Sequence, residues 1–135
     1  MIKVLVAEDE LPLLRGIKVM VERLNSNFEV IMCAKNGKEA IEFLKGNNVD
    51  VVFTDINMPL VDGLEVLDYV GKNMPQTQSV VISGYNEFSY AKEALKSGAK
   101  NYILKPIDQQ ELVVLLEQLE HEVERRKYEF QKNVL

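Results

Sequence analysis

Residues 50–59 read DVVFTDINMP, and this stretch decides the fold. The apolar residues Val51 to Phe53 follow one another without polar alternation, which indicates a strand that is covered on both faces. Strands of this kind belong to parallel sheets with helices on each side. The polar residues that follow, beginning with Asp55, are therefore expected at the carboxyl end of a buried strand.

Four other short apolar runs predict the remaining strands. They cover residues 2–7, 28–34, 79–83 and 101–104, and the central strand is expected at 49–54. Between the strands, apolar residues recur every three or four positions, which predicts helices. These helical patterns cover 11–24, 40–44, 64–70, 88–95 and 112–123. Five strands in strict alternation with five helices predict a doubly wound α/β sheet with right-handed crossovers.

The last helix is expected to begin near Asp108, a suitable N-cap, and to be longer than one face of a sheet requires. Its apolar pattern continues to Phe130, while the residues after Glu120 are densely charged. We expect residues 1–120 to form one domain and residues 121–135 to extend its last helix. The extension is either a solvated tail or a helix that leads to a partner or to a downstream domain.

The composition bounds the function. With 135 residues and 47% hydrophobic residues, the chain suits one globular domain. A net charge of −5 argues against nucleic-acid binding by these residues themselves and suits a divalent cation. The single cysteine, Cys33, excludes an internal disulfide and fits a reducing compartment. Without an apolar run of about 18–20 residues, no membrane span is expected and a cytoplasmic location is favoured.

Chemically active side chains follow four of the predicted strands. Glu8 and Asp9 follow the first, Asp55 the third, Ser83 ends the fourth and Lys105 follows the fifth. In open α/β sheets, sites form where the carboxyl ends of the strands meet. Three carboxylates in one cleft repel each other unless a cation is present, and Mg²⁺ suits a site with few carboxylates.

Three stretches together resemble the receiver domain of two-component response regulators. They are VLVAEDE (4–10), DVVFTDINMPLVDGLEVL (50–67) and VVISGYNEFSYAKEALKSGAKNYILKPID (80–108). The resemblance covers about residues 1–120. It implies a flavodoxin-like α/β fold with five parallel strands in the order 2-1-3-4-5.

The resemblance also implies a role for each site residue. Asp55 would be the phosphoacceptor, forming an aspartyl phosphate. Asp9 and Asp55 would bind Mg²⁺ directly, Asn57 through its backbone carbonyl, and Glu8 directly or through water. Glu8 stands where aspartate is more frequent in the family, and this variant keeps the chemistry.

A second group of residues would act as the switch. Lys105 would pair with Asp55 and then with the phosphoryl oxygens, and its bond to Pro106 is expected to be cis. Ser83, where threonine is more frequent, would turn its hydroxyl to the phosphoryl group, and Tyr102 would follow inward. The bulky Tyr85 would shield the phosphoryl group from water.

The implied partners follow from the same resemblance. A sensor histidine kinase would supply the phosphoryl group, and a phosphorylation-dependent homodimer would form through the helix at 88–95, the strand at 101–104 and the last helix.

The third stretch resembles receivers joined to AraC-type helix-turn-helix output domains, which indicates transcriptional regulation. DNA would be bound only by that absent output domain. The chain would act on its own phosphorylation and dephosphorylation, not as an enzyme with an outside substrate.

Three alternatives stay open. A stand-alone receiver would act by protein–protein contact alone. A Mg²⁺-dependent phosphohydrolase also uses an aspartate nucleophile at a strand end, but that pattern places it on the first strand. A flavin-binding module would need a phosphate-binding loop after the first strand, and Glu8, Asp9 and Glu10 oppose phosphate there.

Overall fold

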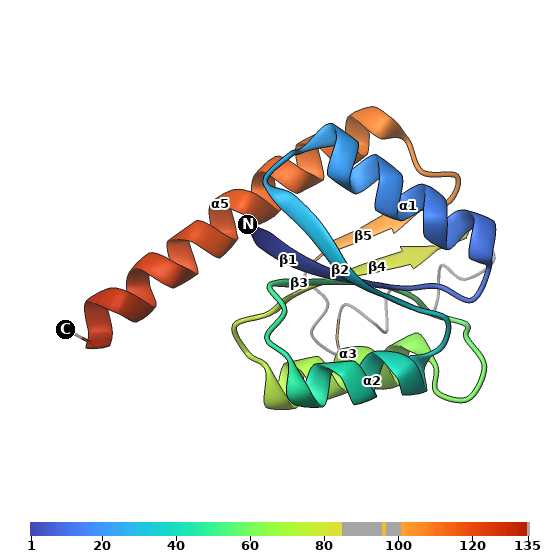
Figure 1. Cartoon of the computed structure of the whole chain (residues 1–135), viewed down its shortest axis with the longest axis horizontal. Coiled ribbons are helices and arrows are strands. Elements are labelled where there is room, and N and C mark those ends of the chain that lie inside the picture. Colours follow the sequence, from blue (N-terminus) through green and yellow to red (C-terminus); the bar gives the residue numbers. More distant parts are fainter. Residues whose placement is uncertain (85–95, 97–100, 135) are drawn as a thin grey trace.

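The computed structural model describes residues 1–84, 96 and 101–134, and these form a five-stranded parallel sheet with helices on both faces (Figure 1). The strands are β1 (Ile2–Ala7), β2 (Phe28–Ala34), β3 (Val51–Asp55), β4 (Gln78–Ser83) and β5 (Asn101–Leu104). Their order is β2-β1-β3-β4-β5, and every neighbouring pair is parallel. The predicted fold class is confirmed, and β3 reaches one residue further than expected, so that Asp55 is its last residue.

The described helices are α1 (Leu11–Leu24), α2 (Gly37–Gly46), α3 (Gly63–Asn73) and α5 (Gln109–Val134). In Figure 1, α1 and α5 cover one face of the sheet, while α2 and α3 cover the other. The helix predicted at 88–95 and the shielding role predicted for Tyr85 lie outside the described residues. Within the described part of the chain, every helix is too short or too polar to cross a membrane.

Side-chain caps explain where α2, α3 and α5 begin; at the start of α3, Asp62 Oδ1 accepts a hydrogen bond from the N–H of Glu65 at 3.0 Å. Asn36 Oδ1 accepts a hydrogen bond from the backbone N–H of Glu39 at 2.8 Å, at the start of α2. Asp108 Oδ1 accepts one from the N–H of Gln110 at 2.8 Å, which confirms the predicted cap of α5. Each cap satisfies a backbone donor that has no partner within its own helix, and such a cap contributes about 1 kcal/mol.

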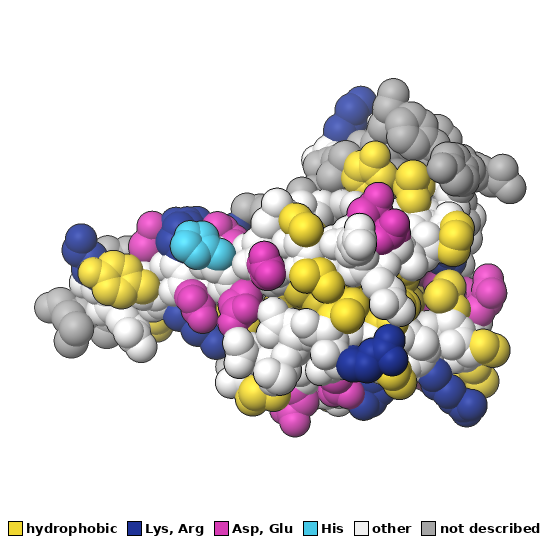
Figure 2. All heavy atoms as spheres, turned by 90° about the horizontal axis from the view of Figure 1, so that it is seen from above, with side chains coloured by type: hydrophobic (Ala, Val, Ile, Leu, Met, Phe, Trp, Pro, Cys, Tyr) yellow, Lys and Arg dark blue, Asp and Glu magenta, His cyan; other side chains and the backbone are white. Residues whose placement is uncertain are grey.

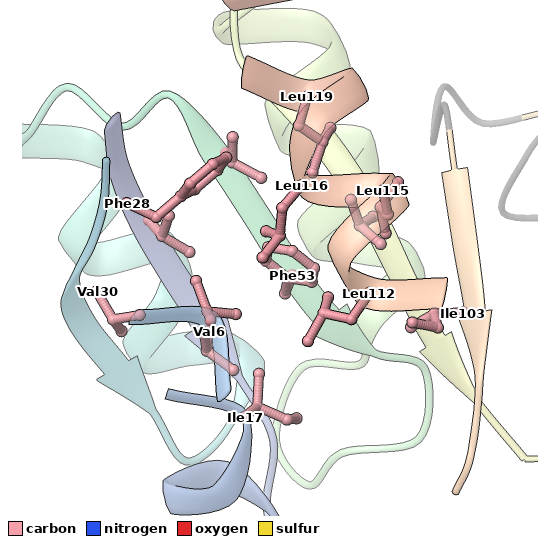
Figure 3. Packing of buried hydrophobic residues seen from close by; sticks show 14 of the residues in the cluster. Val6, Ile17, Phe28, Val30, Phe53, Ile103, Leu112, Leu115, Leu116 and Leu119 are labelled. Carbon is pink, nitrogen blue, oxygen red and sulfur yellow. The ribbon is translucent and has the colours of Figure 1, made fainter. Parts of the chain in front are cut away.

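Two apolar cores hold the layers together, one on each face of the sheet. The larger core packs α1 and α5 onto the strands, with Phe28, Phe53, Leu112 and Leu116 at its centre (Figure 3). The smaller core packs α2 and α3 against the opposite face. Because β3 lies between both cores, all five of its residues are buried. Its last residue, Asp55, is therefore held in place from both sides.

The loop between β3 and α3 is fixed by close backbone contacts. The N–H of Gly63 donates to the carbonyl of Ile56 at 2.7 Å, and a Cβ at Gly63 would lie 1.8 Å from the carbonyl oxygen of Asp55. On the other side of the loop, the N–H of Gly37 donates to the carbonyl of Val61 at 3.0 Å. The start of α3 can approach the end of β3 this closely only because Gly63 carries no side chain.

We therefore expect Gly63→Ala to destabilise the fold by about 1–3 kcal/mol, because the added methyl group meets backbone that cannot move aside. The matched control is Gly16→Ala within α1, where a Cβ meets no atom within 4 Å. That control should be neutral or stabilise by about 0.5–1 kcal/mol, since alanine favours a helix. Urea unfolding of both variants measures the difference; equal stabilities would contradict the close approach at Gly63.

Candidate functional site

The sheet order brings four strand ends together at its carboxyl edge. In the registers of neighbouring strands, Ala7 pairs with Thr54, Asp55 with Ile82, and Ser83 with Leu104. The residues that follow these pairs along β1 and β5 are Glu8 and Lys105. The predicted convergence of polar side chains at this edge is therefore a direct result of the topology.

Three acids form a compact cluster at this edge. Ligand oxygens of Glu8, Asp9 and Asp55 all lie within 4.8 Å of one another. Glu8 is fully buried, Asp55 is 3% exposed and Asp9 is exposed. Two carboxylates are thus withdrawn from water while a third faces it, which leaves one open side for a ligand.

Lys105 supplies the positive charge for the cluster. Its Nζ lies 3.0 Å from Glu8 Oε1 and 3.2 Å from Asp55 Oδ2, so that one ammonium group pairs with two carboxylates. The N–H of Lys105 donates to the carbonyl of Ser83 at 2.8 Å and fixes the backbone next to β4. The bond between Lys105 and Pro106 is cis, as predicted.

The electrostatics follow from burial and from these pairs. Burial raises the pKa of Glu8 to about 7; Lys105 opposes the shift and repulsion from Asp55 adds to it. Burial lowers the pKa of Lys105, but its contacts with Glu8 and Asp55 outweigh this and raise the pKa above its ordinary value. Lys105 therefore stays charged, whereas Glu8 changes its charge near neutral pH.

Asp55 is oriented by backbone as well as by Lys105. Its Oδ1 accepts a hydrogen bond from the N–H of Ile56 at 2.7 Å. The hydroxyl of Thr54 donates to the Asp55 carbonyl at 2.8 Å, in the buried part of the strand. These contacts hold the carboxylate in one direction. A backbone donor has no signature in the sequence, so the contribution of Ile56 could not be predicted.

Ser83 and Tyr102, the two predicted switch residues, occupy different environments. Ser83 is fully buried, and its hydroxyl has no hydrogen-bond partner among the residues that the structure describes. Tyr102 lies on the outside of β5, with 41% of its surface exposed, and lines a groove of about 440 Å³ together with Val114 of α5. Its inward movement remains a prediction.

Asn57 completes the set of predicted residues. It is exposed, in the loop that follows β3. The structure thus brings Glu8, Asp9, Asp55 and Lys105 into one cluster. The pair between Glu8 and Lys105 was not anticipated, because the sequence pointed to Asp55 as the partner of Lys105.

Comparison with known proteins agrees with this arrangement. A family model described as the response regulator receiver domain matches residues 4–117. The transcriptional regulatory protein YesN of Bacillus subtilis strain 168 is 40% identical over 126 residues, which make up 93% of this chain and 34% of YesN. HptR of Staphylococcus aureus strain N315 is 30% identical over 119 residues, 88% of this chain and 46% of HptR.

A solved structure shows the same fold. The receiver domain of AraT, a response regulator from Geobacillus stearothermophilus, superposes with a TM-score of 0.86 at 38% identity, over 93% of this chain and 97% of that one. The chain spans about a third to a half of the length of the curated relatives named above. With its family match, its fold and its carboxyl-edge cluster, the chain belongs to the response regulator receiver domains.

Proposed function

We propose that this receiver domain takes a phosphoryl group onto Asp55 and changes its surface in response. The observation that carries the proposal is the setting of Asp55. Asp55 is held at the end of a buried strand, and its Oδ2 lies 3.2 Å from Lys105 Nζ. Ser83, the last residue of the neighbouring strand β4, has a hydroxyl without a hydrogen-bond partner among the described residues. Response regulators receive their phosphoryl groups from sensor histidine kinases, and such a kinase is the proposed donor here.

The transfer is a nucleophilic displacement at phosphorus. A carboxylate oxygen of Asp55 forms a bond to phosphorus while the bond to the donor's leaving nitrogen or oxygen breaks, and the leaving group takes that electron pair. Lys105 stabilises the charge of the transferred group with its ammonium. The phosphoryl group stays on the protein until water removes it, so Asp55 is an input to the domain and not a site for an outside substrate.

The donor set fits Mg²⁺. Glu8, Asp9 and Asp55 offer hard oxygen ligands within 4.8 Å of one another, with Asn57 in the loop after β3 as the proposed backbone ligand. When bound, Mg²⁺ would offset the repulsion among the carboxylates and the charge of the incoming phosphoryl group. Lys105 alone cannot neutralise three acids, which is why a divalent cation suits the cluster.

The proposed switch consists of linked movements of Ser83 and Tyr102. Charge-assisted hydrogen bonds contribute about 1.5–3 kcal/mol each, so bonds from Ser83 and Lys105 to the phosphoryl oxygens supply roughly 3–6 kcal/mol. A shift of a two-state equilibrium from 1:99 to 99:1 needs about 5.5 kcal/mol. Tyr102 would move inward as the Ser83 hydroxyl turns. These energies are sufficient for a large change in population.

We also propose a division of the chain and an output. Residues 1–120 form the receiver domain, and residues 121–135 extend its last helix toward an output domain. YesN and HptR carry the description of transcriptional regulatory proteins, which supports an output that acts on transcription. An AraC-type helix-turn-helix domain is the proposed form of that output, and DNA would be contacted only through it.

Phosphorylation is expected to depend on Asp55 itself. Incubated with acetyl phosphate and Mg²⁺, the protein should gain one phosphoryl group, measured by intact mass, and Asp55→Asn should gain none. Asp68→Asn, on the half-exposed surface of α3, is the control and should behave as the parent protein. An Asp55→Asn protein that is phosphorylated at the same rate would overturn the proposal.

The stability of the metal-free protein should depend on Glu8. In the folded state the pKa of Glu8 is about 7, above its ordinary value of 4.5. At pH values between these two, Glu8 therefore holds a proton in the folded protein that it loses in the unfolded protein. Stability should therefore fall by about 1–3 kcal/mol as pH rises through this window in a chelator. Glu8→Gln should remove that decrease, while the exposed Glu42→Gln should keep it.

The test is urea unfolding at a series of pH values. Adding Mg²⁺ at pH 8 should restore much of the stability that the parent protein loses in the chelator, because the cation offsets the negative charge of deprotonated Glu8 and its neighbouring carboxylates. Parallel curves for the parent protein and Glu8→Gln would show that Glu8 does not change its protonation in this range.

A phosphoryl mimic is expected to promote dimers through β5 and α5, with the helix predicted at 88–95. Tyr102 and Val114 expose 41% and 53% of their surfaces there. Beryllium fluoride with Mg²⁺ should shift the protein to a dimer in analytical ultracentrifugation, and Val114→Glu should prevent the shift. Val19→Glu is the matched control, since Val19 on α1 is 56% exposed. An unchanged mass with the mimic would remove the dimer proposal.

A further inference from the structure

The last helix continues beyond the body of the domain. Val123 of α5 is 4% exposed and is the last residue of the helix in the apolar core. Residues 124–134 form the part that we call the α5 overhang (Figure 1). Figure 2 shows it projecting from the body with acidic and basic side chains next to one another. Among the described side chains of residues 124–132, only that of Arg126 is not exposed.

Arg126 connects the overhang to the amino-terminal edge of the sheet. Its Nη1 donates to the carbonyl of Pro75, in the segment before β4, at 2.8 Å. With its side-chain oxygen toward α5, Gln78 accepts hydrogen bonds from Arg126 Nη1 and Nε, both at 3.0 Å. Gln78 is 1% exposed, so its amide is fixed within the body. A planar guanidinium with several bonds to fixed acceptors restricts direction as well as distance.

The neighbouring Arg125 shares one partner with Arg126, whose Nε lies 3.1 Å from Glu122 Oε1, but Arg125 makes no hydrogen bond or ion pair outside α5 among the described residues. It pairs with Glu122 and Glu129, both on α5 itself, at 2.6 Å. Ion pairs three or four residues apart favour helix formation, which a short projecting segment needs in water. They do not connect the helix to anything outside it. Both arginines therefore support the helical state through Glu122, and Arg126 in addition supports the direction of the overhang.

Few other contacts hold that direction. Lys127 Nζ lies 3.6 Å from Asp50 Oδ1, but its side chain is 57% exposed, and an exposed pair at this distance contributes little. A groove of about 620 Å³ runs along the overhang, with Met74 and Phe130 among the residues that line it. Because this space is not filled by packed side chains, the polar contacts of Arg126 are the main restraint among the described residues.

Gln78, the hydrogen-bond partner of Arg126, belongs to β4, whose other end lies next to the proposed phosphorylation site. Gln78 is the first residue of β4 and Ser83 is the last. All six residues of β4 are buried, and the strand pairs with β3 on one side and with β5 on the other. A shift of β4 at Ser83 would therefore be passed along a confined strand to the residue that holds the overhang.

We propose that Arg126 is a positioning residue that sets the angle of the α5 overhang and couples it through Gln78 and β4 to the state of Ser83. The first part concerns the unphosphorylated protein and stands on the contacts above. The coupling to Ser83 rests on the proposed phosphoacceptor function.

The first part is tested by the distance between two nitroxide labels, measured by pulsed electron paramagnetic resonance. The labels are placed at Glu42→Cys on α2 and Lys132→Cys on the overhang, with Cys33→Ala to remove the native thiol. Arg126→Met should broaden the distance distribution, and Arg125→Met should leave its width and mean unchanged. Far-UV circular dichroism of each variant shows whether the overhang remains helical.

The outcomes separate the two arginines. An unchanged distribution in Arg126→Met would overturn the proposal. Equal broadening in Arg125→Met would also overturn it, since ion pairs within the helix would then control the overhang. Gln78→Leu provides an independent variant from the side of the body, and it should broaden the distribution as Arg126→Met does while the helical content is kept.

The coupling is tested on the same labelled proteins with beryllium fluoride and Mg²⁺. The mimic should shift the mean distance in the parent protein and should cause no shift in Arg126→Met. No shift in the parent protein would overturn the coupling. Phosphorylation by acetyl phosphate is measured in parallel by intact mass, so that a protein which accepts the phosphoryl group without moving its overhang is distinguished from one that accepts none.

Discussion

The ammonium group of Lys105 lies between two buried carboxylates, 3.0 Å from Glu8 and 3.2 Å from Asp55, and the whole carboxyl edge of the sheet depends on this contact. Without it, two acids would be withdrawn from water beside a third with no compensating charge, and burial of unpaired charge is strongly unfavourable. The sheet order makes the contact possible, since it places the ends of β1, β3 and β4 in sequence before β5. One lysine against three acids leaves an excess of negative charge, which the proposed divalent cation would offset.

The unpartnered hydroxyl of Ser83 adds a second imbalance to the same edge. A buried polar group without a hydrogen bond costs about 1–3 kcal/mol. The described part of the chain offers this hydroxyl no acceptor, and a phosphoryl oxygen on Asp55 would be one. In the proposed function, the energy of the switch would come partly from relieving this defect of the resting state, and not only from new contacts in the phosphorylated state.

Much of the fold could be predicted because strand burial leaves a strong pattern. Consecutive apolar residues such as those of β3 marked the central strands, and the polar residues after them marked the site. The pairing of Glu8 with Lys105 was missed because the reach of a lysine side chain depends on the spacing of strand ends, which no local pattern encodes. Arg125 and Arg126 are indistinguishable in the sequence, since only the placement of α5 on the sheet decides which of them faces the body.

The attachment of the α5 overhang mainly through Arg126 has a consequence for the rotational position of the residues that follow it along the helix. An α-helix turns by about 100° and rises about 1.5 Å per residue. A single residue inserted directly after Arg126 would leave the contacts with Pro75 and Gln78 intact, yet it would rotate everything beyond them by roughly 100°. An insertion of seven residues would rotate the following segment by almost two full turns, so that it would face nearly its original direction. The same insertion would move the segment outward by roughly 10 Å. The anchored helix thus transmits an orientation as well as a position, and a segment joined to it would be sensitive to the number of residues between them more than to their identity.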